Sequence, residues 1–338
     1  MFVRALPLLA LIGCAPSAPV GPAAPNSQPV EVRSCTGGTL AEVAQGEFDH
    51  TGNSISVALG WPRHIAEDTL ATDGDWMPLN AKFAYGATNN DLEDEEVEIW
   101  IGNCQGSVDF MGTTRTDDDG RISVGLDPSA VAGYGEFTVF YRVVGDGSVT
   151  TATLSKYPVG TRLLVFDIDG TLTTADSELF IDMFSELGSG SYLPEARPGA
   201  VQTVATRYDQ NYEIVYLTGR PYWLDGITRD WLDALALPPG TLHLARTNGE
   251  ALPIDSGVGE YKADYLSELQ ALGFVFDFAY GNATTDIYGY ANAGIPADRT
   301  LIMGTNGGEQ GTLAGGDDYL VHLATIGAEP AISQPFTR

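Results

Sequence analysis

The pattern of apolar residues changes at Pro158-Val159-Gly160, and this change constrains the fold more than any other feature of the sequence. Before it, apolar residues form short, strand-length runs separated by turns. After it, nearly continuous apolar runs alternate with stretches of helical length. Consecutive strands favour a sandwich, whereas buried strands that alternate with helices favour a parallel sheet. The sequence therefore predicts a β-sandwich domain at 47–157, an α/β domain at 158–326 and a tail at 327–338.

The first region predicts an antiparallel β-sandwich of immunoglobulin-like size, without helices and without a catalytic cluster. Two acidic runs, Asp91–Glu98 and Asp117–Asp119, are interpreted as a solvated strand edge and a hairpin turn, with calcium binding as the alternative. The main expected strands are Ile55–Leu59, Ala81–Tyr85, Val97–Ile101, Arg121–Val124 and Phe137–Val144.

The second region predicts a Rossmann-like parallel sheet covered by helices on both faces. In such sheets the functional site lies at the carboxyl ends of the strands. The expected strands are Leu163–Phe166, Glu213–Leu217, Thr241–Ala245, Phe274–Tyr280 and Thr300–Met303. The expected helices are Ser177–Leu187, Gly199–Asp209, Tyr222–Leu235, Tyr261–Leu272 and Thr285–Ala293.

The first 14 residues have the layout of an export signal, with Arg4 followed by an apolar run that is too short to span a bilayer. The run ends at Gly13-Cys14, which resembles the bacterial lipobox, so Cys14 is the expected lipidation site. An ordinary signal peptide with a chance cysteine is the alternative. The proline-rich segment 15–46 is interpreted as an extended linker. The sequence thus predicts an exported protein on a lipid anchor in a bacterial cell envelope, with outer-membrane sorting favoured.

Two cysteines remain once Cys14 is set aside, namely Cys35 and Cys104. An even number of cysteines in an oxidising compartment suggests a disulfide bond. Two separate buried thiols are the alternative.

The formal net charge of −28 excludes several classes of partner. Nucleic-acid binding needs a basic surface, and attraction to anionic lipid by charge alone needs one too. Only three of the 17 basic residues are lysines, namely Lys82, Lys156 and Lys262, so the position of each lysine is informative.

Two aspartates follow the first strand of the α/β domain, in the run Asp167-Ile168-Asp169-Gly170-Thr171. Residues two apart at a strand end project to the same side. Two neighbouring carboxylates repel each other unless a cation lies between them, and hard oxygen ligands in a small site favour Mg²⁺. An EF-hand calcium loop is rejected because Leu172 stands where that loop needs glycine.

Three further polar groups follow later elements in chain order. Thr218-Gly219 after the second strand suits a phosphoryl oxygen, although such turns are common. Lys262 is expected at the start of a helix, where the helix dipole disfavours it unless an anion is present. Asn282 supplies a neutral metal ligand or a helix cap, and Asp286 holds a metal-bound water or orients Lys262.

Together these four groups resemble the motifs of the haloacid-dehalogenase-like phosphohydrolases. Phe166–Thr173, Leu217–Pro221, Tyr261-Lys262, Gly281–Tyr288 and Gly294–Glu309 resemble the catalytic domain of lipin-type phosphatidate phosphatases. The resemblance covers residues 158–315 and implies a haloacid-dehalogenase-like fold with a minimal cap and an open site.

The resemblance also implies roles for the residues. Asp167 would be the nucleophile and Asp169 the general acid and base. Asp167, the Asp169 carbonyl and Asn282 would hold Mg²⁺, with Asp286 supporting the metal. Thr218, Gly219 and Lys262 would bind the phosphoryl group.

The leading hypothesis from the sequence is a Mg²⁺-dependent phosphomonoesterase that acts on phosphatidic acid or a related lipid phosphate at a membrane. One alternative is a periplasmic phosphatase that acts on soluble or protein-borne phosphate. Another is a non-catalytic phosphatidate-binding lipoprotein, because the lipin-like domain also occurs in eukaryotic lipid-transfer proteins where the aspartate pattern is broken. Both Asp167 and Asp169 are present here, which favours the enzyme.

Overall fold

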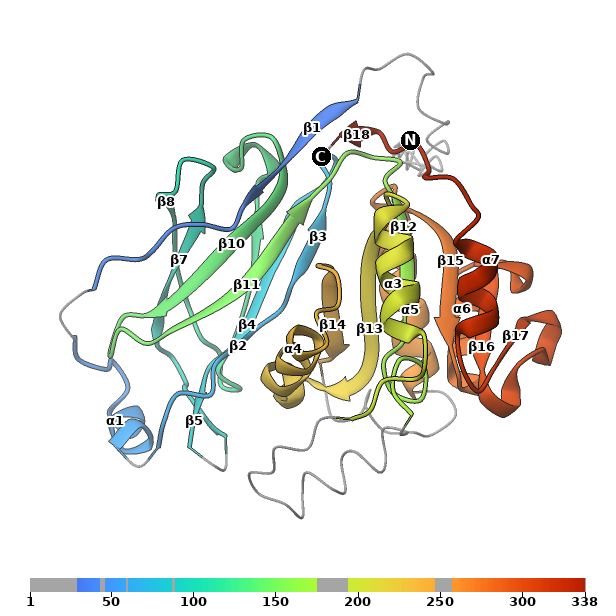
Figure 1. Cartoon of the computed structure of the whole chain (residues 1–338). Coiled ribbons are helices and arrows are strands. Elements are labelled where there is room, and N and C mark those ends of the chain that lie inside the picture. Colours follow the sequence, from blue (N-terminus) through green and yellow to red (C-terminus); the bar gives the residue numbers. More distant parts are fainter. Residues whose placement is uncertain are drawn as a thin grey trace, which may run out of the picture.

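The computed structural model describes residues 29–42, 46–58, 60–86, 89–174, 194–246 and 257–337. The lipobox at Cys14, most of the proposed linker and the predicted helix Ser177–Leu187 lie outside these residues. A β-sandwich-like domain packs beside a parallel α/β domain (Figure 1). The predicted mixed α/β content, with a parallel sheet after a sandwich, is therefore confirmed at this level. The predicted minimal cap stays a prediction.

The sandwich domain is built from a seven-stranded and a three-stranded sheet. The larger sheet has the strand order β18–β1–β10–β11–β3, and in addition β7 pairs with β10 and β8 pairs with β7. The smaller sheet has the order β2–β4–β9. Their shared core includes Met77, Val97 and Tyr141. The strands are β1 Val30–Cys35, β2 Ile65–Ala66, β3 Thr69–Ala71, β4 Met77–Lys82, β5 Ala84–Tyr85, β6 Asn90–Asp91, β7 Glu96–Gly102, β8 Val108–Arg115, β9 Arg121–Leu126, β10 Tyr134–Val143, β11 Val149–Lys156 and β18 Phe336–Thr337.

The sequence analysis expected a purely antiparallel sandwich, and this expectation was wrong. β1 pairs parallel with β10, and β11 pairs parallel with β3. Both parallel partners are far apart in the chain, so no hairpin signal marks them.

A helix stands where the strand Ile55–Leu59 was predicted. Helix α1 spans Thr51–Ala58. Glu95, just before β7, accepts the backbone N–H groups of Asp49 at 3.0 Å and His50 at 2.9 Å, and the side-chain amide of Asn53 at 2.9 Å. The prediction was wrong because a carboxylate more than 40 residues away binds the backbone donors ahead of this helix.

Both ends of the described chain join the larger sheet. Residues 30–35, assigned to the linker, form β1, and residues 336–337, assigned to the tail, form β18. Val30 and Phe336 are partners in a parallel pairing. Phe336 is buried and stacks on Tyr157, the residue that follows β11. The two segments thus add strands β1 and β18 to the larger sheet, next to β10.

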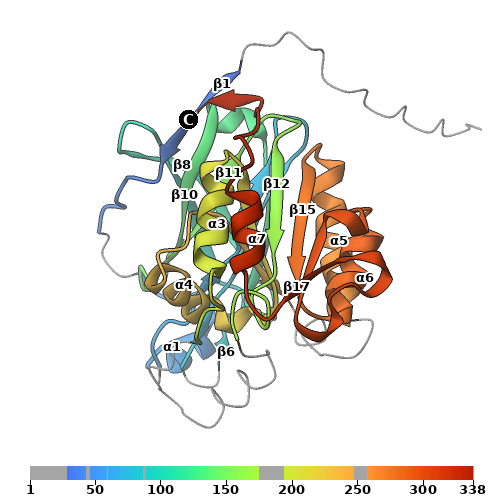
Figure 2. The same cartoon turned by 45° about the vertical axis from the view of Figure 1, so that its right-hand side comes forward.

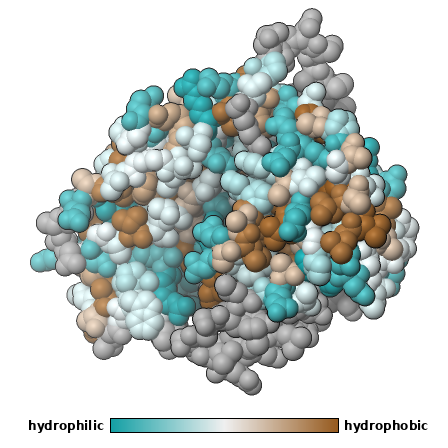
Figure 3. All heavy atoms as spheres, viewed as in Figure 1, coloured by the Kyte–Doolittle hydropathy of each residue, from teal (hydrophilic) through white to brown (hydrophobic). Residues whose placement is uncertain are grey.

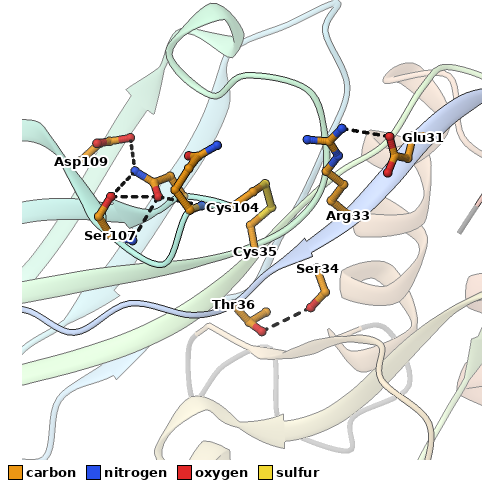
Figure 4. Close-up of a disulfide and its surroundings, with 10 residues drawn as sticks. Glu31, Arg33, Ser34, Cys35, Thr36, Cys104, Ser107 and Asp109 are labelled. Atoms are coloured by element: carbon orange, nitrogen blue, oxygen red, sulfur yellow. Dashed lines mark hydrogen bonds and ion pairs between the residues drawn. A yellow bond between two sulfur atoms is a disulfide. The ribbon is translucent and has the colours of Figure 1, made fainter.

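A disulfide bond joins Cys35 at the end of β1 to Cys104 in the turn between β7 and β8 (Figure 4). The turn itself is ordered by Asn103, whose side-chain oxygen accepts the backbone N–H of Ser107 at 3.1 Å. The disulfide therefore links the end of β1 to the turn between β7 and β8, 69 residues along the chain.

Removing this disulfide is expected to lower stability by about 4 kcal/mol, because a crosslink that closes a loop of this length restricts the unfolded chain. The double variant Cys35→Ser/Cys104→Ser should show a lower midpoint in urea unfolding than the oxidised wild type. Reduced wild type should match the variant. An unchanged midpoint would contradict the expectation.

The α/β domain contains one six-stranded sheet in the order β14–β13–β12–β15–β16–β17, and all its pairings are parallel. The strands are β12 Arg162–Phe166, β13 Glu213–Pro221, β14 Thr241–Ala245, β15 Val275–Gly281, β16 Thr300–Met303 and β17 Leu313–Gly316. The helices are α3 Ala200–Asp209, α4 Asp225–Ala234, α5 Gly257–Ala271, α6 Thr284–Asn292 and α7 Leu320–Ile326.

Two cores lie on opposite faces of this sheet, and β12 contributes alternately to both. Leu163 and Val165 pack with α5 and α6, whereas Leu164 and Phe166 pack on the face covered by α3. Figure 2 shows α3 and α7 on one side and α5 and α6 on the other. The sheet is thereby buried on both faces, and its strand ends are left to form the site.

The surface in Figure 3 mixes hydrophilic and apolar residues. The most exposed large apolar side chain among the described residues is Val321 of α7, at 81%. No described helix has the length and apolarity needed to cross a membrane.

Polar contacts hold the two domains together. Asp68, between β2 and β3, accepts hydrogen bonds from Leu242 of β14 and from Arg229 of α4. A second ion pair joins Glu67 to Arg246 at 2.9 Å.

Candidate functional site

The polar residues predicted at the strand ends lie together at the carboxyl edge of the parallel sheet. Asp167 follows β12, and its backbone N–H continues the sheet pairing to Tyr280 of β15 at 3.0 Å. Thr218 lies in the last part of β13, and Asn282 follows β15. Gly170 takes a positive φ of 72°, which lets the chain turn away directly after the two aspartates. This clustering follows the rule that places sites at the carboxyl ends of parallel strands.

Lys262 forms the centre of the site. Its Nζ lies 2.7 Å from Asp167 Oδ1 and 2.5 Å from Asp286 Oδ1, and all three side chains are almost fully buried. Lys262 is in the second turn of α5 and not at the start of a helix, so the helix-dipole argument for it was wrong. Helix α5, which carries Lys262, packs closely against α6 at Gly289. A Cβ at Gly289 of α6 would lie 3.0 Å from Lys262 Cβ and 3.1 Å from the Gly259 carbonyl.

Asp286 orients Lys262 and caps α6. Its Oδ2 accepts the backbone N–H of Asn282 at 2.9 Å and of Ala283 at 3.0 Å, while Oδ1 binds Lys262. Both carboxylate oxygens are therefore engaged within the protein. Of the two roles that the sequence left open for Asp286, the geometry matches the orientation of Lys262.

Asp169 is held by Arg220, a residue that the sequence analysis did not identify. Arg220 donates from Nε to Asp169 Oδ2 at 2.8 Å and from Nη2 to Oδ1 at 2.7 Å. Thr218 Oγ1 adds a hydrogen bond to Asp169 Oδ2 at 3.2 Å. Arg220 is fully buried and also donates to Thr228 of α4. Its place in the Thr-Gly-Arg-Pro segment was the available signal, but an arginine after a turn has no distinctive spacing.

The local charges and burial determine what this site can attract. Three carboxylates, of Asp167, Asp169 and Asp286, face two cations, so the cluster carries one net negative charge when every group is ionised. Burial raises the pKa of Asp167 to about 7, against the opposing effect of Lys262. Burial opposes the charge of Lys262, yet Asp167 and Asp286 hold its pKa above the usual range.

The expected magnesium ligands agree only in part with this arrangement. Thr171 Oγ1 lies 2.8 Å from Asp167 Oδ2 and 3.1 Å from Asn282 Oδ1. The Thr171 hydroxyl has one proton and donates it to one of these two oxygens at a time. Carboxylate and amide oxygens are ligands of the hard type that Mg²⁺ takes. Asp286, in contrast, is engaged elsewhere. Within the described ranges, no three His, Cys, Asp or Glu side chains gather in a way that could hold a metal ion.

The site is also less accessible than the sequence analysis expected. Asp167 is 4% exposed, Asp169 is 8% exposed and Thr218 is fully buried. The expectation of an open site is therefore not met by these side chains, because α5, α6 and the turn after β13 pack directly around them.

Two family models match this chain in succession. Residues 62–155 match the model described as "PITM 1-3, beta-sandwich domain", and residues 164–304 match "PITM 1-3, LNS2 domain". The similarity is to membrane-associated phosphatidylinositol transfer proteins. Curated relatives agree with it: protein retinal degeneration B of Drosophila melanogaster is 31% identical over 278 residues, and membrane-associated phosphatidylinositol transfer protein 3 of Mus musculus is 29% identical over 270.

These relatives are much longer proteins. The matches cover 79% and 78% of this chain but only 21% and 26% of the two relatives. The chain thus spans about a fifth to a quarter of the length of the relatives it matches. Among solved structures, the Yersinia pseudotuberculosis adhesin InvE shares 18% identity over 28% of this chain and 32% of that one, with a TM-score of 0.22, which is too low to support an argument.

The comparisons correct three predictions. The assignment to the lipin-type phosphatases is wrong, because both matching models and the curated relatives belong to the transfer-protein family. The phosphomonoesterase function and the assignment as a hydrolase are wrong for the same reason. A resemblance in motifs alone does not separate catalysis from binding on the same fold.

Proposed function

We propose that this protein is a non-catalytic binder of anionic phospholipids of the phosphatidate or phosphatidylinositol type, and that it associates with membranes. The observation that carries the proposal is the ordered match of both domains to one family, whose named members are membrane-associated phosphatidylinositol transfer proteins. Because the similarity extends through both domains, the proposal concerns the pair and not a shared α/β fold alone.

The geometry of Asp169 supports binding without hydrolysis. A general acid must give up a proton to the leaving group. The Asp169 carboxylate instead accepts two hydrogen bonds from the Arg220 guanidinium. Two-point contacts of this kind fix the orientation of the carboxylate. The residue that would act as the acid therefore has a structural partner.

The headgroup phosphate is proposed to lie at the carboxyl edge of the sheet, near Asp167, Lys262 and Thr218. When every group is ionised, the single net negative charge of the cluster would repel a phosphate unless a cation were added. Mg²⁺ held by Asp167 and Asn282 remains part of the proposal, and when bound it would supply the positive charge that a phosphate needs.

Export and lipidation at Cys14 also remain proposals. Mass spectrometry of the purified chain tests them.

Vesicle flotation tests the proposal. We expect the full chain to float with vesicles that contain phosphatidate or phosphatidylinositol, and to stay behind with vesicles of phosphatidylglycerol of matched charge. No inorganic phosphate should appear. The Asp167→Asn variant should lose about tenfold in Mg²⁺-dependent binding, the typical cost of losing a ligand or its support. Asp118→Asn, in an exposed turn of the sandwich, is the matched control.

Three results would refute the proposal. The first is equal flotation with phosphatidylglycerol and phosphatidate, because it would show attraction without headgroup recognition. The second is phosphate release from phosphatidate. The third is an Asp167→Asn variant that binds like Asp118→Asn, which would place the headgroup elsewhere on the chain.

A further inference from the structure

A cavity of about 680 Å³ lies in the sandwich domain, away from the site described above. Its lining comes from the turn before β4, the segment after β9 and the end of β11. Lys156 of the lining ends β11, and β11 leads into β12, so this part of the cavity lies near the amino end of β12, whereas the site follows the carboxyl ends of the strands. Its volume is in the range of small-molecule sites.

Trp76 contributes an aromatic side chain to the lining of this cavity. Its side chain is 61% exposed, which is unusual for an indole held in a folded domain. A Cβ at Gly125 of β9 would lie 3.3 Å from the indole Cε3, so the ring lies against the glycine backbone. The absence of a side chain at Gly125 lets the ring rest there with its other side open. Trp76 therefore offers an aromatic platform.

Lys156 neutralises one of the acidic side chains of the cavity. Its Nζ binds Asp73 Oδ1 at 2.7 Å and the carbonyls of Pro128 at 2.8 Å and Val131 at 2.9 Å. Lys156 is 4% exposed, and these three acceptors use all three of its N–H groups. Tyr134 also donates its hydroxyl to Asp73. Lys156 thus holds three parts of the cavity lining together, and the charge of Asp73 is neutralised by this ion pair.

Two other carboxylates of the cavity keep their charge uncompensated. Asp75 accepts the backbone N–H of Trp76 at 2.7 Å, and Asp127 accepts the backbone N–H of Ser129 at 2.8 Å. Hydrogen bonds from Ser129 lower the pKa of Asp127, so it is ionised at neutral pH. In the part of the chain that the structure describes, neither carboxylate forms an ion pair. The cavity therefore combines an open indole with two unpaired negative charges.

We infer that this cavity binds an organic cation of the alkylammonium class, with the trimethylammonium group of choline as its simplest form. An alkylammonium is attracted to the face of an indole within about 6 Å of its centroid, and carboxylates at the rim add to this attraction. A neutral sugar would use the indole but not the two charges. A bare metal ion would use the charges but not the indole. The choline group occurs both free and as a lipid headgroup, and the experiment separates these sources.

Calorimetric titration of the full chain with choline chloride tests the inference, with 3,3-dimethylbutan-1-ol as the neutral ligand of the same shape. We expect choline to bind and the neutral alcohol to bind at least about tenfold more weakly. Trp76→Ala and the double variant Asp75→Asn/Asp127→Asn should each weaken choline binding about tenfold. Trp61→Ala is the matched control, because Trp61 is equally exposed, at 60%, but lies outside the cavity.

The sources are separated with phosphatidylcholine vesicles. Flotation that free choline competes away identifies the lipid headgroup, and titration without flotation identifies a soluble cation. The inference is overturned if the neutral alcohol binds as well as choline, if Trp76→Ala behaves like Trp61→Ala, or if choline gives no heat at millimolar concentration. Each variant changes an exposed or half-exposed side chain, so a folded protein is expected in every arm.

Discussion

Replacing Asp68 by alanine is expected to destabilise the protein by about 2–6 kcal/mol, because two backbone N–H groups that bind its carboxylate would lose their acceptor, at about 1–3 kcal/mol each. The Asp68 side chain is 1% exposed. It accepts backbone N–H groups from both domains, from Thr153 of β11 at 2.9 Å and from Leu242 of β14 at 3.0 Å. Arg229 of α4 donates two more hydrogen bonds, at 3.1 and 3.2 Å. One carboxylate therefore fastens the sandwich to the α/β domain.

Urea unfolding followed by circular dichroism measures this effect. Glu67→Ala is the matched control, because Glu67 also pairs across the domain boundary, with Arg246, but both side chains are partly exposed, at 20% and 39%. A half-exposed pair of this kind contributes about 1 kcal/mol or less. Asp68→Ala should also broaden the transition, as the domains begin to unfold separately. A loss no greater than that of Glu67→Ala would show that Asp68 does not couple the domains.

The local pattern of the sequence was sufficient to predict the α/β domain. Every predicted strand of this domain begins within one residue of the observed start, and Thr241–Ala245 and Thr300–Met303 agree at both ends. These strands are buried on both faces, so the runs of Val, Leu, Ile and Phe in the sequence report the fold directly. β17 was missed because Leu313–Gly316 is half glycine and lies at the edge of the sheet, where no apolar run is needed.

Pairings between distant segments could not be predicted in the same way. β1 is joined to β10 and β18 by backbone hydrogen bonds between residues about 100 to 300 positions apart. Its exposed and partly exposed side chains resemble those of a linker. Helix α1 likewise depends on Glu95, which lies outside the segment that it caps. In each case the stabilising group is absent from the local sequence.

The sequence predicted which residues lie together in the site, but it did not predict the function of the site. Asp167, Thr218, Lys262 and Asn282 were expected together, since strand ends of a parallel sheet meet. Arg220 decides how Asp169 is used, and it was invisible because its effect depends on a two-point contact across the site. All three lysines are buried, so their scarcity was informative, but only Lys262 belongs to this site.

Replacing Lys262 by methionine is expected to cost about 3–5 kcal/mol at neutral pH, because Asp167 and Asp286 would remain buried without their cation. Methionine keeps the length and apolar stem of the side chain, so the loss reports the charge. The double variant Lys262→Met/Asp286→Asn should recover part of the loss, since one of the two carboxylates is then neutral. A double variant as unstable as the single one would contradict this account.

The loss should also depend on pH. Burial raises the pKa of Asp167 in the folded protein to about 7, above its unfolded value of about 3.9. Between these two values the folded state binds more protons than the unfolded state, so stability falls as pH rises through this window. Without Lys262, which lowers this pKa, the window extends to higher pH. Urea unfolding should therefore give Lys262→Met a larger deficit against wild type at pH 8 than at pH 5. Equal deficits at the two pH values would show that Asp167 is not the group that Lys262 compensates.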